Sequence, residues 1–107
     1  MSISERDWKV LRKLKPLTLE RLCERILMEC VEVASGDGET FHERYLNLYN
    51  LIHQRNAQIA AAFDDLRRSR AVPAIAQIYE LKLLEGSEFL EFSEETRDAV
   101  LLILGRD

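Results

Sequence analysis

The fold of this chain is decided by residues 23–52, which read CERILMECVEVASGDGETFHERYLNLYNLI. On both sides of the SGDG segment, residues 35–38, large apolar residues recur at intervals of three and four, which is the spacing of one helical face. The two glycines of SGDG can adopt left-handed backbone conformations that end a helix. The stretch therefore predicts two amphipathic helices that run antiparallel and are joined by a short turn.

Helix signals continue on either side of this pair. Ser4, Ser87 and Ser93 each precede an acidic residue and are predicted to be N-caps, with Ser87 beginning a short turn over residues 88–91. Pro16 disfavours a helical conformation in the residue before it, so we expect a break there. Pro73 suits the first turn of a helix, and Gly86 is expected to end that helix. The predicted helices, in chain order, cover residues 4–15, 17–34, 39–70, 72–85 and 94–104.

The composition indicates an all-α protein. Of the 107 residues, 47% are hydrophobic and 32% charged, with only four glycines and two prolines. No segment alternates apolar and polar residues at the period of a β-strand. We expect one domain, residues 1–107, that forms a small bundle of four to five helices built on a long antiparallel helix pair.

The predicted helix 39–70 is longer than a domain of this size. If it is continuous, it spans about 48 Å, whereas a compact domain of 100 residues is roughly 34 Å across. The helix must therefore kink or pack its ends on something extra, most economically a second copy of the chain. A homodimer is the expected state, and docking of another protein is the alternative use of the same surface.

A candidate interface follows from the apolar stripe of this helix and from the apolar C-terminal segment 99–104. Asn56 is the one polar residue inside the stripe, where a buried asparagine can determine register or oligomeric state; alternatively, the helix has turned enough for Asn56 to reach solvent. The candidate interface residues are Leu48, Ile52, Asn56, Ile59, Phe63, Leu101 and Leu104.

Two basic clusters could meet nucleic acid. The first consists of Lys9, Arg12, Lys13 and Lys15, and the second of Arg67, Arg68 and Arg70. Against this function, the net charge is −4, and basic residues at a helix C-terminus also pair with nearby acids and complement the helix dipole. We therefore regard a nucleic-acid-associated accessory protein as the alternative to a protein-interaction module.

Metal binding and catalysis find little support in the motifs. Glu39 and His42 form one Glu-x-x-His pair, but a di-metal carboxylate site needs two, and Asn50 precedes His53 at that spacing. His42 and His53 lie about 16 Å apart along a helix, so only a dimer could bring them to one ion. No nucleophile elbow, phosphate-binding glycine loop or Cys-x-x-Cys is present. We expect no cofactor, no metal and no enzymatic activity.

The cysteines and the N-terminus bear on location. Cys23 and Cys30 lie about 10.5 Å apart along one predicted helix, too far for a disulfide, and we expect them to be reduced core residues. The N-terminal segment has no apolar core of signal-peptide length, and the longest apolar run, residues 99–104, is far shorter than the roughly 20 residues that span a bilayer. A cytoplasmic protein that does not enter the membrane is expected.

The segment HERYLNLYNLIHQRNAQIAAAFDDLRRSRA (42–71), with LERLCERIL (19–27) before it and FSEETRDAV (92–100) after it, resembles a group of short bacterial helical proteins with no established activity. The resemblance covers most of the chain and implies a stand-alone bacterial cytoplasmic protein. It transfers no functional residue. Some of these proteins are named as peptide-transporter components, a role that we do not expect, because a substrate-binding component needs export and a larger two-lobed body.

Overall fold

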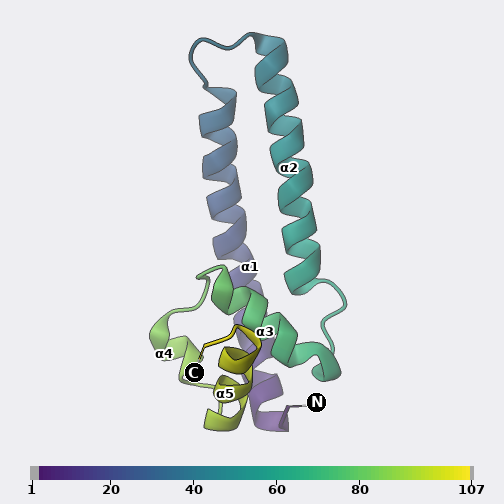
Figure 1. The fold of residues 1–107 in the computed structure, drawn as a ribbon, viewed down its shortest axis with the longest axis vertical. Helices are drawn as coiled ribbons and strands as arrows, with labels where there is room; N and C mark the ends of the chain where they lie inside the picture. Colours follow the sequence, from purple (N-terminus) through teal and green to yellow (C-terminus); the bar gives the residue numbers. More distant parts are fainter. Residues whose placement is uncertain (1–2, 107) are drawn as a thin grey trace.

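The computed structural model describes residues 3–106, and every regular element within them is helical (Figure 1). This confirms the all-α prediction. Two long helices form an antiparallel hairpin, and three short ones gather at its open end. In chain order the elements are α1 (Glu5–Ala34), α2 (Phe41–Phe63), the 3₁₀ turn η1 (Arg68–Arg70), α3 (Ala71–Glu80), α4 (Gly86–Phe89) and α5 (Glu94–Ile103).

Helix α1 runs through Pro16, so the predicted break at this residue is wrong. The helix begins where expected, because the Ser4 hydroxyl accepts a hydrogen bond of 3.1 Å from the Asp7 N–H. Pro16 removes one backbone hydrogen bond, at a cost of about 3 kcal/mol. The opposite side of the same turns buries Leu14 and Thr18 against the base of the molecule. That burial holds the helix together across the proline.

SGDG forms the predicted turn, but α1 ends with Ser35 as its C-cap and Gly36 has no positive φ, so a left-handed glycine does not end that helix. Gly38 has a φ of 81°, a conformation that side-chain-bearing residues rarely adopt. The Thr40 hydroxyl then caps α2 by accepting a hydrogen bond of 3.0 Å from the Glu43 N–H. Across the turn, the Arg44 guanidinium donates a hydrogen bond of 2.9 Å to the Ala34 carbonyl at the end of α1. The turn therefore closes α1 and α2 into a hairpin.

Helix α2 ends at Phe63, so a continuous helix over 39–70 is wrong. Asp65 takes a φ of 54°, which aspartate tolerates better than most residues. Its carboxylate accepts two hydrogen bonds of 2.8 Å from Arg67 and lies 3.7 Å from Arg70. The chain reverses there and continues into α3. The reversal lets Phe63 and Leu66 contribute to the core instead of extending the helix.

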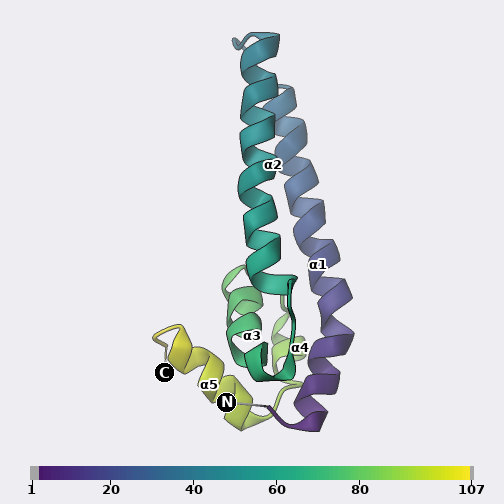
Figure 2. The same ribbon diagram turned by 90° about the vertical axis from the view of Figure 1, so that its right-hand side faces the viewer.

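Helices α3, α4 and α5 pack beside the N-terminal half of α1 and form what we call the base (Figure 2). The predicted end of the fourth helix at Gly86 is wrong, because α3 stops at Glu80 and Lys82 turns the chain with a φ of 59°. Gly86 instead begins α4, and Glu85 caps it through reciprocal hydrogen bonds with Glu88, so the predicted N-cap at Ser87 is wrong. The predicted cap of the last helix is confirmed, with the Ser93 hydroxyl accepting from the Thr96 N–H.

A buried carboxylate joins α1 to α5. Asp7 is 1% exposed and accepts hydrogen bonds from the Ser93 N–H (2.9 Å), the Ser93 hydroxyl (2.6 Å) and the Thr96 hydroxyl (2.6 Å). Burial by itself would raise the pKa of Asp7, but these donors outweigh it and hold the pKa below its ordinary value. The carboxylate also lies at the positive N-terminal end of α5, which stabilises its charge.

The molecule is elongated, with extents of 52 × 25 × 25 Å and a Cα radius of gyration of 16.6 Å. A compact domain of this length would have a radius of gyration of about 13 Å. Every fully buried residue within 3–106 lies in 3–22 or 62–100, and residues 23–61 include none. The hairpin therefore projects beyond the only core of the described chain. Among residues 3–106, no helix combines the length and apolarity needed to cross a membrane.

Candidate functional site: the apolar hairpin face

The two hairpin helices meet along a seam of half-buried side chains. On α1 the seam includes Ile26 and Val33, and on α2 it includes Leu48 and Leu51. An ion pair also links the two helices across the seam, because Arg55 donates hydrogen bonds of 3.1 and 2.8 Å to the two carboxylate oxygens of Glu29. These bonds lower the pKa of Glu29 and raise that of Arg55. The ion pair also aligns the two helices along their length.

One broad side of the hairpin is polar. Rotation by 100° per residue from the seam places Arg21, Arg25 and Glu32 of α1 on the same side as Glu43, Asn47 and Gln54 of α2. The base helices cover the lower part of this side: Arg21 donates to Glu88 (2.6 and 2.9 Å) and to the Leu83 carbonyl (2.7 Å), and Arg25 donates to the Leu81 and Lys82 carbonyls. We call this side the polar hairpin face.

The opposite side carries large apolar residues that nothing in the described chain covers. Both helices contribute to it, because the exposed apolar residues of α1 and α2 lie at similar angles from the seam. We call it the apolar hairpin face. It consists of Leu27 (66% exposed), Val31 (65%), Phe41 (85%), Tyr45 (65%), Tyr49 (60%) and Ile52 (42%).

The exposed area on this face is large for a monomer. An aromatic side chain presents about 150–250 Å², so the three aromatic residues alone leave on the order of 400 Å² open to water. The three aliphatic residues add to this. Soluble monomers rarely expose a contiguous apolar patch larger than a few hundred Å², and a standard interface buries about 800 Å² per partner. The apolar hairpin face therefore has the size of an interface.

Polar groups are ordered at the margin of the face. The Arg44 guanidinium lies 4.6 Å from the centre of the Phe41 ring, a cation–π distance. The ring of His53 stacks on that of Tyr49, with centroids 6.3 Å apart. These contacts hold Phe41 and Tyr49 in place although the side chains face water. The face is therefore partly organised before any partner arrives.

The structure divides the seven predicted interface residues. Ile52 and Asn56 are exposed on the apolar hairpin face, and Leu48 is half-buried in the seam. Phe63 is 4% exposed and belongs to the core of the protomer, so it is not available to a partner. Ile59 and Leu104 pack partly against the same core, and Leu101 is half-buried.

Sequence reasoning left five of the six residues of the apolar hairpin face out of the candidate interface, namely Leu27, Val31, Phe41, Tyr45 and Tyr49. The signal was present, because Phe41, Tyr45 and Tyr49 recur every four residues along α2. What the sequence could not indicate is that no further helix covers this side.

The predicted basic residues lie around the base, and most are paired. Lys13 pairs with Glu91, Arg68 with Glu5 (2.8 Å), and Arg67 and Arg70 with Asp65. The bonds from Arg67 lower the pKa of Asp65, and the same pairing raises that of Arg67. Arg68 does not pair with Asp64 or Asp65 among residues 3–106, because it donates to the Ile3 carbonyl and to the Glu5 carboxylate instead.

Three basic residues of the first cluster have no ion pair within residues 3–106. Lys9 and Arg12 are exposed, and Lys15 is half-buried. Lys9 and Leu27 are 18 residues apart, which is about five helical turns, so both side chains point in the same direction from α1. Arg12 and Cys30 share a direction for the same reason. Lys9 and Arg12 therefore continue the apolar hairpin face toward the base.

The metal-type residues do not assemble within the described chain. No group of three His, Cys, Asp or Glu side chains in residues 3–106 could hold an ion. His42 is exposed on the outer side of α2, and Glu39 accepts a hydrogen bond of 3.0 Å from Asn47. Cys23 and Cys30 are free thiols and half-buried beside the seam, not members of the core.

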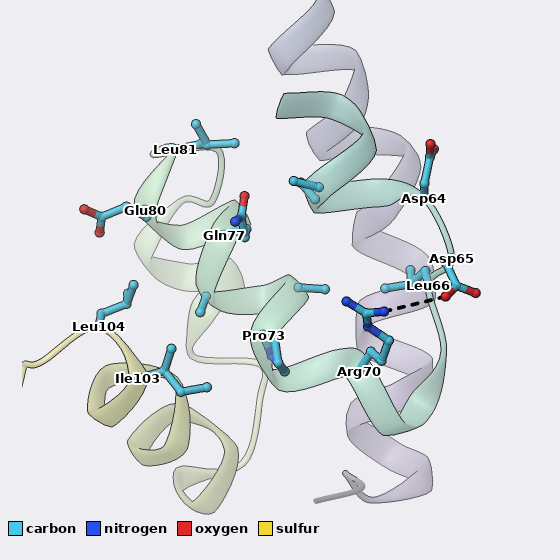
Figure 3. A pocket seen from close by; sticks show the side chains of 14 residues that line it. Asp64, Asp65, Leu66, Arg70, Pro73, Gln77, Glu80, Leu81, Ile103 and Leu104 are labelled. Atoms are coloured by element: carbon cyan, nitrogen blue, oxygen red, sulfur yellow. Dashed lines mark ion pairs between the residues drawn. The ribbon is translucent and has the colours of Figure 1, made fainter. Parts of the chain in front are cut away.

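A groove of about 500 Å³ lies where α2 ends beside α3 and the last turn of α5 (Figure 3). Its apolar lining includes Leu66, Pro73 and Ile103. Its charged rim is balanced, since Asp65 pairs with Arg70 (3.7 Å) and Glu80 with Arg106 (3.0 Å). The groove is apolar enough for a ligand, but it contains no converging set of reactive side chains.

Comparison with known proteins does not assign the chain to a family. No protein-family model, no curated protein and no solved structure matches the chain.

Proposed function

We propose that this protein is a non-catalytic helical interaction module of the bacterial cytoplasm, which self-associates through the apolar hairpin face. The single observation that carries the proposal is the uncovered row of Leu27, Val31, Phe41, Tyr45, Tyr49 and Ile52 in the part of the hairpin, residues 23–61, that contains no fully buried residue. Burial of such a row is the main favourable term in protein association. Two hairpins that meet through these faces form a four-helix bundle.

A second copy of the chain accounts for this surface without a further component. The face has the area that one side of a standard dimer interface buries. It is a flat row along two helices, and two such rows can pack against each other as ridges into grooves. The polar hairpin face then remains in water on the outside, where Glu32, Glu43 and Gln54 are suited to lie.

The test is the mass of the protein in solution, with two variants of α2. At high micromolar concentration the wild type is expected to sediment as a dimer. Tyr45→Glu/Tyr49→Glu places two charges on the apolar hairpin face, and we expect it to be a folded monomer because both side chains are exposed in the protomer. Gln54→Glu, on the polar hairpin face of the same helix, is the matched control and should remain dimeric.

Circular dichroism on the three proteins separates loss of association from loss of fold. A wild-type protein that stays monomeric at high micromolar concentration would overturn the proposal. Dissociation of the Gln54→Glu variant to the same extent as the double tyrosine variant would also contradict it, because association would then not depend on the apolar side.

A further inference from the structure

We propose that the dimer binds divalent transition-metal ions such as Zn²⁺ at two equivalent sites, each formed by His42 of one copy and His53 of the other. This inference rests on the proposed self-association and adds a ligand to it. Within one copy the two imidazoles cannot share an ion, because eleven residues separate them by about 16 Å along α2. The site is therefore incomplete without a second copy of the chain.

The two histidines lie on one edge of the apolar hairpin face. At 100° per residue they point in directions only about 20° apart, on the side of α2 that faces away from α1. Both side chains are exposed, and neither belongs to an ion pair within residues 3–106. The ring of His53 lies almost parallel to that of Tyr49, with 7° between the planes, which holds the imidazole beside the apolar residues of α2.

The apolar residues of α2 and the two histidines have nearly the same centre. The row from Phe41 to Ile52 is centred between residues 46 and 47, and the histidines are centred between residues 47 and 48, about 1.5 Å further along the helix. When two copies of this row pack in opposite directions, a residue before the centre meets the residue equally far after it. His42 of each copy therefore lies beside His53 of the other, and the two-fold symmetry produces two such pairs.

Burial of the aromatic residues favours this packing of α2 on α2. If the hairpins ran in the same direction, two-fold symmetry would place α1 of each copy on α2 of the other. Phe41 and Tyr45 adjoin Ala34 at the end of α1, so they would then meet only Ala34 and the turn of the second copy. In the opposite direction, Tyr45 meets Tyr49 of the second copy and Phe41 meets Ile52. The second arrangement buries more aromatic surface.

The chemistry of the histidine pair suits a metal ion. Imidazole nitrogens are preferred ligands of Zn²⁺, at about 2.0–2.1 Å, and water can complete the coordination at the solvent-exposed edge of the interface. An ion that binds the dimer but not the monomer stabilises the dimer by mass action. The concentration of free metal ion would then regulate how strongly the protein self-associates.

Sedimentation of tag-free protein with and without Zn²⁺ tests the site. Zn²⁺ should lower the dissociation constant of the wild-type dimer about tenfold when each site is about two-thirds filled, and EDTA should reverse the effect. Without metal, His42→Ala and His53→Ala should each dimerise within about twofold of the wild type, because both side chains lie at the edge of the face. Neither variant should respond to Zn²⁺, because each substitution removes one ligand from both sites.

A mixture of the two variants is the matched control. A dimer of one His42→Ala copy and one His53→Ala copy retains one complete site, made of His53 from the first copy and His42 from the second. Zn²⁺ should therefore lower the dissociation constant of this heterodimer about threefold, although neither variant responds by itself. Native mass spectrometry measures the heterodimer when one variant carries a heavy-nitrogen label.

The possible outcomes separate the inference from the proposed function. A wild-type dimer that does not respond to Zn²⁺ would overturn the inference and leave self-association intact. A response that persists in either single variant would also overturn it, since the ion would then be bound elsewhere, for example by Cys23 and Cys30, which are present in every protein. Failure of the mixture to respond would exclude the pairing of His42 with His53. A wild type that stays monomeric with and without Zn²⁺ refutes both proposals.

Discussion

The base and the hairpin of this protein are made from similar residues but are stabilised in different ways. In the base, residues from α1, α3 and α5 enclose side chains such as Ile75 and Val100 that have no exposed surface. The hairpin helices also carry many large apolar residues, but only those in the seam pack against another helix, and those on the apolar hairpin face do not. Short helices gain most of their stability from tertiary packing, so half of the packing surface of the hairpin is unused in the protomer. The comparison teaches that the base is packed within the protomer, whereas the apolar hairpin face is covered by nothing in residues 3–106 and would be buried only in the dimer that we propose.

The sharpest way to break this comparison is to make the same substitution in both regions. Ile75→Ala in the base should lower the free energy of unfolding by about 2–5 kcal/mol, because it leaves a cavity in a fully buried site. Ile52→Ala in the hairpin should cost no more than about 0.5 kcal/mol when it is made in the monomeric Tyr45→Glu/Tyr49→Glu background. Urea unfolding of both variants measures the difference. Equal losses would show that the hairpin face is already packed in the protomer.

The buried carboxylate of the base provides a test by pH. Asp7→Asn should cost about 1–3 kcal/mol, because an amide replaces one acceptor oxygen by a donor that faces the Ser93 and Thr96 donors. The folded pKa of Asp7 lies below its ordinary value of 3.8, so its stabilisation is present above about pH 4 and is lost as the pH falls through the folded pKa. Unfolding curves from pH 7 to pH 2 should therefore show the two proteins converging at the acid end. A gap that stays constant would mean that Asp7 does not titrate in the folded protein.

The hairpin should show its dependence on a partner through concentration. Because association stabilises the folded state by mass action, the wild-type melting temperature should rise by a few degrees between low and high micromolar concentration. The Tyr45→Glu/Tyr49→Glu variant should melt at the same temperature throughout. Calorimetry at several concentrations makes the measurement, and a wild-type melting temperature that does not move would count against self-association.

The smallest expected effect concerns the alternative function, nucleic-acid binding through the exposed basic residues Lys9 and Arg12. Binding to nucleic acid through Lys9 and Arg12 would weaken steeply between about 50 and 200 mM salt, since it depends on counterion release. We expect duplex DNA to show no binding at physiological salt, and Lys9→Glu/Arg12→Glu to abolish any that appears at low salt. Dimerisation through an apolar face should change little over the same range of salt. Fluorescence anisotropy with labelled DNA, beside sedimentation of the same samples, compares the two functions directly.

Local sequence signals predicted the capped ends of the helices well. Ser4, Thr40 and Ser93 begin helices with their hydroxyls accepting backbone N–H groups, and of these Ser4 and Ser93 were predicted. The SGDG turn was also predicted, because Gly38 needs a positive φ. Such features depend on a few adjacent residues, so they can be recognised before the tertiary structure is known.

The helix interiors and ends that were predicted wrongly depend on distant residues. Pro16 lies inside α1 because Leu14 and Thr18 are buried against the base. The helix expected to reach residue 70 stops at Phe63 because Asp65 turns the chain and binds Arg67 and Arg70. No pattern within a single helical segment contains these contacts.

The sequence alone thus determined that the chain is helical, where its hairpin turns and which residues are apolar on each long helix, because helical period and capping are local properties. Only the tertiary structure decided which of these apolar rows are buried inside the protomer. Phe63 and Leu104 face the core, whereas Phe41, Tyr45 and Tyr49 face water, although all five lie in apolar patterns of the same kind. The reason is physical: periodicity places residues on one side of a helix, but the position of every other helix decides whether that side is covered.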